Sequence, residues 1–551
     1  MFDAIAEFFR RPIRTAKTVD RVINAEPGGP AKSAVNTNRS PKVAVLERIE
    51  WIVAIVLSAT VLFLLIVRTT HAGALWRDEC ESVQLARMPR FADVLENLHY
   101  TSFPVLFPTI VRAYTTLFGA SDLSLRCFGL AMGIAFIGAA WFQSRSITGQ
   151  VPLLLLALVG LNPNFLTAGM WVRGYGVGSV LIVLAFSLTA KFLLQPTTSR
   201  LWAVFLIWLA SMQCLFFNGT LVPAIILAGT VVLLLHRQFK WTLLLLCIAG
   251  GCAIAYVPYV LKIYLQEHGP AAHIKKAVSP SFSQQWLMEA CGAPISVMPW
   301  IWLSVVLLSV GGAAWRLSGI WGRKPVSQRD MLLFGAITIV ASIPLYYAFM
   351  LFLRRPPLPR YYLVLFCLLA SAADLLLANL SRLYWLRLAR FATVLAGTLM
   401  LPYAAWPVVV ERQTNIDIIA QKLEKDAGPN DVIVVNSWSF GVSFNWYYHG
   451  SARWMTLPEI REHRIHRYDL LIGKMAEFFP LDDVQQAVAA ALQSGNRVWI
   501  VNRFNVRSTW SRQFGAFLQR HASKGRLIIP AQPSVSAQEN ALLLLAEGWE
   551  Y

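Results

Sequence analysis

Three acidic side chains lie together in the sequence LWRDECESVQLAR (residues 75–87), namely Asp78, Glu79 and Glu81. Only ten Asp or Glu residues occur between positions 51 and 410, so this stretch holds three of them. Adjacent carboxylates repel each other unless a proton or a cation lies between them, and such pairs serve as general bases or as ligands of a divalent metal. We therefore take Asp78 and Glu79 as candidate catalytic residues. Glu81 is the weakest candidate, since a solvated acid here would only stabilise a helix N-terminus.

Basic residues and nearby tyrosines form a second group on the predicted outer side of the membrane: Arg173, Tyr175, Arg354, Arg355, Arg360 and Tyr361. An arginine at that face is costly unless it meets an anion, and a guanidinium binds phosphate through two parallel hydrogen bonds. Contact with lipid headgroups explains Arg354 and Arg355 equally well. Arg173 and Arg360, each followed closely by a tyrosine at the entry to an apolar run, favour a phosphate-binding role.

Weaker candidates lie in the predicted outer loops. His99 could be a ligand or a proton shuttle, although a single loop histidine is more often neither. The long loop at 265–296 contains His268, Lys275 and Lys276, which could supply a metal ligand or hold phosphate but follow no fixed spacing.

Two further pairs carry metal-ligating or redox-active side chains. His463 and His466 are three positions apart, but no third ligand type lies near them, so we interpret them as a solvated face. Cys80 and Cys291 both fall in predicted outer loops and could form a disulfide if that side of the membrane is oxidising. The sequence fixes neither their distance nor their geometry.

The elements that must position these residues are mostly membrane-spanning helices. The chain has 551 residues and 56% of them are hydrophobic, which excludes a soluble globular protein. Apolar runs long enough to cross about 30 Å of hydrocarbon lie at 51–68, 123–142, 151–168, 176–194, 201–217, 220–235, 241–263, 297–315, 331–353, 361–380 and 391–410. These runs predict about eleven transmembrane helices. The short stretch at 103–119, which contains prolines, predicts an interfacial helix instead.

The loop charges predict the orientation. With the N-terminus inside, the loops predicted to be cytoplasmic carry many Arg and Lys residues and a single acid, Asp330, which is the positive-inside pattern. The cluster at 78–81 then lies outside. The net charge of +19 is concentrated in the membrane region, because residues 411–551 hold fifteen basic and fourteen acidic residues. We therefore expect no nucleic-acid partner.

Three domains are predicted from these patterns. Residues 1–48 form a cytoplasmic tail that is basic and amphipathic and then disordered, residues 49–410 form the transmembrane domain, and residues 411–551 form an extracytoplasmic α/β domain. In the last of these, helical periods at 415–427 and 481–495 alternate with short apolar runs, as in a layered α/β fold. It contains no phosphate-binding glycine loop or nucleophile elbow, so we expect no catalysis there.

The order of these motifs resembles the GT-C glycosyltransferases, especially the relatives of protein O-mannosyltransferases and of the lipid A aminoarabinose transferase, which are glycosyltransferase family 39-like. The motifs are RDECESVQLAR, FPVLFPTIVRAYTTLFGASDLSLRCFGLAMG, WVRGYGVGSVLIVLA and PRYYLVLFCLLASA, followed by a soluble tail containing NWYYHG and RVWIV. The resemblance covers roughly residues 45–410. The order of the motifs is more specific than any one of them.

The resemblance implies a polyprenyl-phosphate-linked sugar donor, an extracytoplasmic active site, an inverting displacement and, as in some relatives, a divalent metal ion. The matching positions are the first-loop acidic pair, Asp78 (the base) and Glu79, and the phosphate side, Arg173 with Tyr175 and Arg360 with Tyr361. Asp78, Glu79 and His268 are then the candidate metal ligands. The chain departs from the family in one stretch: many members have an acid and the sequence HPPLYY where this chain has YTSFPVLF. His99 and Ser102 are the candidate substitutes for the family's residues there. Residues 169–176 also lack a carboxylate, which weakens a two-acid metal site.

These observations predict a multi-pass enzyme of a bacterial inner membrane that transfers the donor sugar to an envelope glycolipid or polysaccharide. The alternative is a transporter or flippase of an anionic lipid or lipid-linked sugar, which would use the same arginines. A transporter should carry ionisable groups near mid-membrane and show paired repeats. The predicted spans are nearly free of such groups, Asp374 lies close to the inner end of its span, and no repeat is visible, which favours the enzyme.

Overall fold

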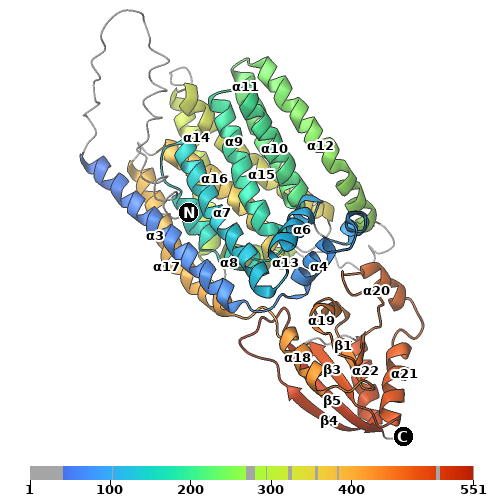
Figure 1. Cartoon of the computed structure of the whole chain (residues 1–551). Coiled ribbons are helices and arrows are strands. Elements are labelled where there is room, and N and C mark those ends of the chain that lie inside the picture. The colour runs from blue at the N-terminus through green and yellow to red at the C-terminus, as the bar shows by residue number, and fades with distance from the viewer. Residues whose placement is uncertain are drawn as a thin grey trace, which may run out of the picture.

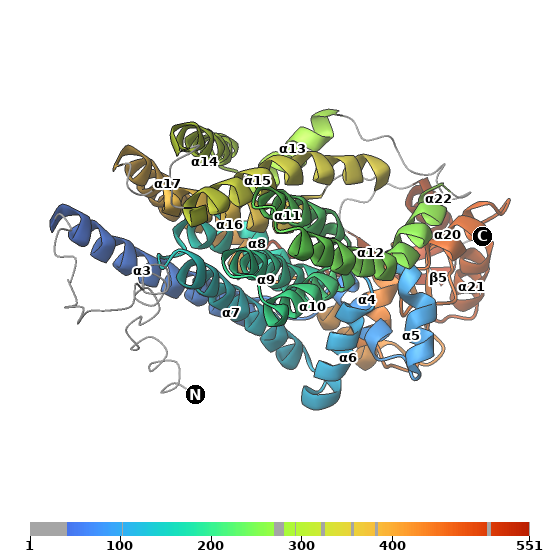
Figure 2. The same cartoon turned by 90° about the horizontal axis from the view of Figure 1, so that it is seen from above.

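The computed structural model describes residues 41–101, 103–268, 280–292, 294–320, 326–353, 358–380, 384–503 and 509–549. They form a bundle of long helices and a smaller domain with a β-sheet, which lies at one end of the bundle (Figure 1). The view from above shows the long helices side by side and the C-terminal domain beyond them (Figure 2). The predicted fold class, a helical membrane protein with a C-terminal α/β domain, is confirmed. The predicted N-terminal tail lies almost wholly outside the described residues.

Nine helices in the described part of the chain are long and apolar enough to cross a membrane. They are α3 (Pro41–His71), α7 (Asp122–Ile147), α9 (Gly174–Leu194), α11 (Phe216–Leu235), α12 (Phe239–His268), α14 (Met298–Ile320), α15 (Val326–Leu353), α17 (Tyr384–Val410) and α16 (Leu363–Asn379), which counts together with the 3-10 turn η4 (Pro359–Tyr362) that precedes it. Each corresponds to a predicted apolar run. Large aliphatic side chains such as Ile254 and Leu351 are exposed on these helices, as expected for surfaces that face lipid. The chain is therefore a multi-pass membrane protein.

Two further predicted runs are not among these nine helices. The run at 201–217 forms α10 (Thr198–Cys214), which has 17 residues and is at the lower limit for a spanning helix. The run at 151–168 is not one helix but a π-helical turn, η2 (Leu155–Gly160), followed by the short helix α8 (Pro163–Ala168). Proline at the first position of α8 has no N–H with which to continue the preceding helix. Residues 151–162, up to this proline, are buried inside the bundle. A fully buried, broken segment therefore has the same apolar composition as a membrane-spanning helix.

The connection between α3 and α7 forms four short helices: α4 (Arg77–Ala86), α5 (Phe91–Asn97), η1 (Leu98–Tyr100) and α6 (Leu106–Phe118). The helix predicted over 103–119 is present as α6, and its 13 residues are too few to span a bilayer. Arg112 of α6 donates hydrogen bonds to the carbonyls of Ala86 (2.9 Å), Met88 (2.7 Å) and Pro89 (3.2 Å). These carbonyls lie at the C-terminal end of α4, so a cationic side chain fixes the helix that carries the acidic cluster.

The C-terminal domain contains five strands, β1 (Val432–Asn436), β2 (Arg453–Thr456), β3 (Val498–Arg503), β4 (Ala522–Ile529) and β5 (Ala541–Trp549), and the helices α18 (Ile416–Asp426), η5 (Trp438–Phe440), α19 (Gly441–Tyr447), α20 (Tyr468–Met475), α21 (Asp482–Gln493) and α22 (Thr509–His521). The sheet order is β2-β1-β3-β5-β4. β1 pairs in parallel with β2 and β3, whereas β5 pairs antiparallel with β3 and β4. One hydrophobic cluster joins the sheet to α18 and α19 and another joins it to α21 and α22, which makes a layered α/β domain as predicted.

The C-terminal domain packs directly on α4. Gln84 of α4 donates to the carbonyl of Val442 (3.0 Å) and accepts from the amide of Asn445 (2.6 Å). The Tyr447 hydroxyl accepts from the backbone N–H of Leu75 (2.6 Å), just before α4. The acidic cluster therefore lies between the helical bundle and the C-terminal domain.

All seven cysteines are free thiols, so the disulfide considered between Cys80 and Cys291 does not form. Both side chains are buried rather than placed in open loops. Cys80 lies on α4, and Cys291 lies at the end of α13 (Pro280–Gly292).

Candidate functional site

The acidic cluster occupies the first turns of α4, and its three carboxylates point to different partners. Glu79 is fully buried, and its Oε1 accepts from Arg126 Nη1 (2.8 Å) and from the backbone N–H of Val172 (3.0 Å). Its Oε2 faces the backbone N–H of Trp76 (3.4 Å), the residue that caps α4. These contacts tie the start of α4 to α7 and to the loop before α9, so Glu79 holds the helix in place.

Asp78 lies among arginines from three elements. Its Oδ2 is 3.8 Å from Nη2 of Arg173 and 3.8 Å from Nη2 of Arg360, and its Oδ1 is 3.8 Å from Nε of Arg77. Arg173 immediately precedes α9 and Arg360 lies on η4 (Pro359–Tyr362), which leads into α16. Burial raises the pKa of Asp78, but Arg173, Arg360 and Arg77 together outweigh burial and lower it to about 2. Asp78 is therefore ionised at neutral pH.

Arg173 and Arg360 keep hydrogen-bonding capacity. Arg173 Nη1 donates to the backbone carbonyl of Asp78 (2.8 Å) and to Glu81 Oε2 (3.0 Å). The Nε atoms of Arg173 and Arg360 are buried and have no hydrogen-bond partner among the described residues. An unpaired buried N–H is costly, so an anion reaching these groups would gain strong charge-assisted hydrogen bonds.

Aromatic rings surround both guanidiniums. Arg173 lies over the ring of Phe103 (4.7 Å to its centroid), and Arg360 lies 5.5 Å from the ring centroid of Tyr361 and 5.8 Å from those of Trp76 and Trp171. The rings of the two predicted tyrosines, Tyr175 and Tyr361, are 6.4 Å apart. Cation–π contacts of this kind hold a guanidinium without using its N–H groups. The predicted residues Asp78, Arg173, Arg360, Tyr175 and Tyr361 are thus brought together at one place.

Glu81 is a buried ion-pair partner and not the solvated neighbour that the sequence favoured. Its Oε1 accepts from both the backbone N–H and the ring Nδ1 of His466, each at 3.0 Å, while Oε2 accepts from Arg173. Burial raises the pKa of Glu81, but His466 and Arg173 outweigh it, so the pKa lies below its usual value. His466 belongs to the C-terminal domain and is 5% exposed. The interpretation of His466 as part of a solvated face is therefore wrong, and His463 is also half-buried, against the ring of Trp454.

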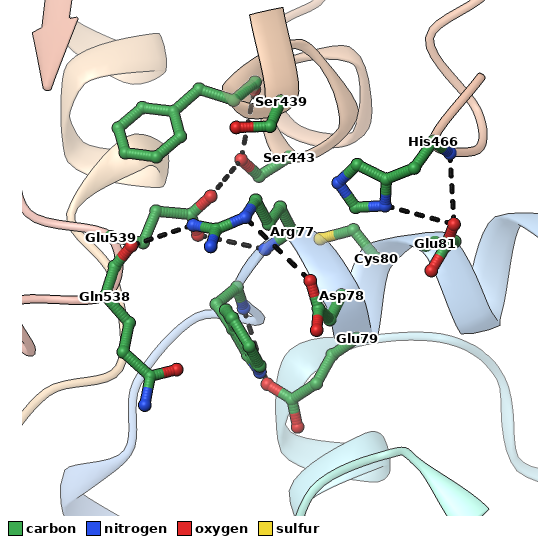
Figure 3. Close-up of polar contacts among 12 residues, drawn as sticks. Arg77, Asp78, Glu79, Cys80, Glu81, Ser439, Ser443, His466, Gln538 and Glu539 are labelled. Atoms are coloured by element: carbon green, nitrogen blue, oxygen red, sulfur yellow. Dashed lines mark hydrogen bonds and ion pairs between the residues drawn. The ribbon is translucent and has the colours of Figure 1, made fainter. Parts of the chain in front are cut away.

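An acid of the C-terminal domain, Glu539, contacts the first residue of α4 (Figure 3). Glu539 Oε2 accepts from the backbone N–H of Arg77 (3.0 Å), and its Oε1 accepts from the Ser443 hydroxyl (2.8 Å). The Arg77 guanidinium turns to the carbonyl of Gln538 (2.8 Å). Burial raises the pKa of Glu539 to about 7.

The other predicted residues lie elsewhere or outside the described residues. His99 is on η1, where its Nδ1 contacts the carbonyl of Glu96 (2.6 Å) and its ring lies beside Tyr100. His268 is the last residue of α12, with only its backbone described. The predictions for Ser102, Lys275, Lys276, Arg354 and Arg355 fall outside the described residues.

The described residues do not fit a divalent metal ion at the acidic cluster. Within the described ranges no group of three or more His, Cys, Asp or Glu side chains could hold a metal. Both oxygens of Glu79 are turned to Arg126 and to backbone N–H groups, and three guanidiniums surround Asp78. Positive charge so close to Asp78 disfavours a cation at the same position.

Several residues of this site were not found from the sequence. Arg126 lies in the apolar run of α7, and an arginine at the edge of a span is itself a signal that could have been used. Trp76 and Trp171 resemble ordinary interface anchors. His466 is almost 390 positions from Glu81, and no local pattern connects them.

No family model matches the chain, and no curated protein matches its sequence. Solved structures do match its fold. ArnT from Cupriavidus metallidurans in the apo state superposes with a TM-score of 0.52 at 13% identity, covering 90% of this chain and 97% of that chain. The same ArnT bound to undecaprenyl phosphate gives 0.48 at 13% identity, covering 90% and 98%. The Archaeoglobus fulgidus oligosaccharyltransferase in complex with Zn and sulfate gives 0.48 at 10% identity, covering 87% and 72%. The resemblance to the GT-C proteins is confirmed at the level of the fold by the first of these.

Proposed function

We propose that this chain is a membrane glycosyltransferase that moves a sugar from a polyprenyl-phosphate-linked donor to a hydroxyl of a cell-envelope glycolipid or polysaccharide. The observation that carries the proposal is the position of one ionised carboxylate, Asp78, beside two buried arginines, Arg173 and Arg360, whose Nε atoms have no partner among the described residues. The fold shared with C. metallidurans ArnT supports it.

These side chains could act on the attacking group and on the leaving group of a displacement at the anomeric carbon of the donor sugar. The acceptor oxygen attacks that carbon while its bond to the phosphate oxygen breaks, and the lipid phosphate leaves with the bonding electrons. Arg173 and Arg360 stabilise the negative charge that develops on the phosphate, and Asp78 takes the proton of the acceptor hydroxyl. Because the incoming and leaving oxygens lie on opposite sides of the carbon, the anomeric configuration is inverted.

Donor binding would also activate the base. In the protein alone, the guanidiniums lower the pKa of Asp78 to about 2, which makes it a weak proton acceptor. A phosphate bound to Arg173 and Arg360 neutralises part of their charge, so the basicity of Asp78 rises when the donor is in place. Tyr175 and Tyr361 line the phosphate side, and Glu79 fixes the helix that carries the base.

We place this site at the periplasmic face of a bacterial inner membrane, with the N-terminus in the cytoplasm. In this proposal residues 1–48 are the cytoplasmic tail, residues 49–410 the catalytic membrane domain and residues 411–551 a periplasmic domain. The support is the positive-inside pattern of the loops. His99, Lys275, Lys276, Arg354 and Arg355 stay predicted substrate contacts, and no step is assigned to a metal ion.

A transporter or flippase is the second candidate, because it would need the same phosphate-binding arginines. It should also carry an ionisable group that changes its partner within the bundle. Asp374 is instead held by Arg390 (2.9 Å) and by the backbone N–H groups of Leu154 (3.1 Å) and Leu155 (2.9 Å). A carboxylate whose two oxygens are both hydrogen-bonded in this way favours a structural role and hence the enzyme.

The test compares turnover by wild type and the Asp78→Asn variant. Purified protein receives a polyprenyl-phosphate-linked sugar fraction and an envelope glycan fraction, both extracted from cells that lack the protein, and released polyprenyl phosphate is measured. We expect Asp78→Asn to lower turnover about 100-fold or more, because the amide cannot take a proton. Asp93→Asn, the same change at a surface acid on α5, is the matched control and should keep wild-type turnover.

Melting temperatures separate catalysis from folding in this comparison. The arginines stabilise the ionised carboxylate, so the amide should reduce stability by about 2 kcal/mol at most. Equal turnover by Asp78→Asn would contradict the assigned base. Movement of the lipid-linked sugar across a vesicle membrane without turnover would favour the transporter. Mass analysis of envelope glycans from the same cells identifies the sugar that is missing.

A further inference from the structure

The contact between Glu81 and His466 joins the candidate site to the C-terminal domain in an unusual way. The carboxylate accepts from both the backbone N–H and the ring Nδ1 of the same histidine, each at 3.0 Å. Two hydrogen bonds from one residue fix the imidazole in position and in rotation. A merely structural contact between two domains does not require a side chain that can donate and accept protons.

The carboxylate also sets the tautomer of His466. Because ionised Glu81 accepts at Nδ1, this nitrogen carries the hydrogen, and in the neutral ring the lone pair is on Nε2. Figure 3 shows the ring above the start of α4, with Nδ1 turned to Glu81 and the opposite edge turned away from it. Carboxylates orient histidines in this way where the second nitrogen must meet a ligand or a substrate.

Aromatic side chains lead from this imidazole to the protein surface. The ring of Trp438 is edge-on to His466 (centroids 5.7 Å apart) and edge-on to Tyr468 (5.2 Å). Trp438 is half-buried and Tyr468 is 57% exposed. A flat aromatic face beside a hydrogen-bond acceptor matches a sugar, whose ring has an apolar C–H face and a rim of hydroxyls.

One arginine links this group to the donor side. Arg173 Nη1 contacts Glu81 Oε2 at 3.0 Å, and Arg173 Nη2 lies 3.8 Å from Asp78 Oδ2. His466, Glu81, Arg173 and Asp78 therefore form a continuous series of charged and polar contacts. The series begins at His466 in the C-terminal domain and ends at Asp78, whose carboxylate faces Arg360.

We propose that the C-terminal domain supplies the acceptor-binding half of the site, in which His466 Nε2, oriented by Glu81, accepts a hydrogen bond from a hydroxyl of a carbohydrate acceptor while Trp438 and Tyr468 pack against its sugar ring. The inference rests on the proposed function and narrows it, because the acceptor is then a glycan or a glycolipid headgroup. It also assigns substrate binding to a domain in which the sequence predicted no chemistry.

Binding measurements test the inference without requiring turnover. The probes are the envelope glycan fraction from cells lacking the protein, for the acceptor side, and undecaprenyl phosphate, for the donor side, each titrated against the purified full chain in detergent. Trp438→Ala and His466→Gln should weaken glycan binding about tenfold or more, the loss of one stacking contact or one hydrogen bond to a buried group. Both variants should bind undecaprenyl phosphate as wild type does.

His463→Gln is the matched control, because His463 lies on the same loop but packs against Trp454 rather than Glu81. It should bind both probes normally. Trp438→Ala leaves the Glu81–His466 pair intact, so its result does not depend on whether the His466 variant folds. Where turnover is measurable, the variants should raise the apparent KM for the glycan and leave that for the donor unchanged.

Two results would overturn the inference. One is wild-type glycan binding by Trp438→Ala and His466→Gln, and the other is an equal loss of glycan and undecaprenyl phosphate binding, which indicates a structural role. Failure of the proposed function looks different. In that case the wild-type protein binds the probes but releases no polyprenyl phosphate, and Asp78→Asn behaves as wild type.

Discussion

Two buried arginine–carboxylate contacts lie at opposite ends of α16, and they differ in geometry. Near its C-terminal end, the inner end in the proposed orientation, Asp374 accepts three hydrogen bonds of 2.9–3.1 Å, from Arg390 and from two backbone N–H groups. Just before its N-terminal end, the outer end in the proposed orientation, Arg360 and Arg173 each approach the Asp78 carboxylate only to 3.8 Å. No hydrogen bond to the Asp78 carboxylate is present among the described residues.

The difference separates a structural ion pair from a ligand-binding group. Asp374 joins α16, α17 and the start of η2, so its bonds satisfy backbone groups of the broken segment as well as a charge. Buried charges that meet at hydrogen-bond distance have little left to offer a substrate. At the outer end the charges are close enough to act on one another and far enough apart to accept a phosphate and a hydroxyl between them.

The largest effect on stability is expected at the inner pair. Asp374→Ala leaves Arg390 buried without a counter-charge and frees the N–H groups of Leu154 and Leu155, which should cost about 3–5 kcal/mol. Thermal unfolding in detergent should show a lower melting temperature. The surviving folded protein should bind undecaprenyl phosphate with wild-type affinity, because the pair does not touch the outer site.

Asp78→Ala is the corresponding change at the outer end. It should reduce stability much less than Asp374→Ala does, while abolishing turnover. If Asp78→Ala destabilised the protein as strongly as Asp374→Ala, the distinction drawn from the two geometries would be wrong.

A smaller effect, confined to affinity, is expected at the outer arginine. Arg360→Lys keeps the positive charge but removes the planar fork and the Nε–H, so binding of undecaprenyl phosphate should weaken about tenfold. The melting temperature should change little, since the contacts of Arg360 are cation–π contacts, a hydrogen bond to Tyr175 and a 3.8 Å approach to the Asp78 carboxylate, with no carboxylate at hydrogen-bond distance among the described residues. Binding is measured by titration with the lipid phosphate.

Arg126→Lys is the matched control, since Arg126 meets the buried Glu79 at 2.8 Å. It should lower the melting temperature and leave the affinity of the folded protein for undecaprenyl phosphate unchanged. A tenfold loss of affinity in both variants would contradict the comparison, because binding of the lipid phosphate would then depend on Arg126 as much as on Arg360.

The membrane helices and the α/β domain were predicted from the sequence because their signals are local. Apolar length predicted the spans, and period 3.6 or short apolar runs predicted α18, α21 and β1. The break in the segment at 151–168 was not predicted, because a buried broken helix has the same composition as an unbroken one. Its break depends on Pro163, and proline also occurs within true spans such as α11.

The candidate site was predicted only in part, for a related reason. Asp78, Arg173 and Arg360 stand out because charges are rare in apolar sequence, and the structure places them together. The roles of Glu81 and His466 depend on how a domain more than 300 residues away docks on α4, which no local pattern records. Burial also cannot be read from residue type, so Glu81 looked like a solvated acid although it is 3% exposed.

A third buried carboxylate, Glu539, tests the comparison under a change of pH. It accepts from Ser443 and from the backbone of Arg77, and no guanidinium of the described residues is hydrogen-bonded to it. Burial raises its pKa from 4.5 to about 7, so the folded state favours the protonated form. The contribution of Glu539 to stability is therefore complete below pH 4.5 and is lost as the pH rises through 7.

Between about pH 5.5 and about pH 8.5, this group should lower the free energy of unfolding by about 2 kcal/mol. Glu539→Gln removes that dependence, because the amide does not ionise and keeps a hydrogen-bond acceptor for Ser443. The pKa of Asp78 and that of Glu81 lie below their usual values, so neither group titrates in this window. Melting temperature as a function of pH in both proteins provides the measurement.

The pKa of Glu459 is also raised to about 7 by burial, so the wild-type curve contains a second contribution. Glu459→Gln is the control that separates them. If the slope of melting temperature against pH were the same in Glu539→Gln and wild type, Glu539 would be ionised throughout. The charge of Glu539 would then have to be compensated by Arg77. The contact between α4 and the C-terminal domain would in that case be a structural ion pair, like Asp374 with Arg390.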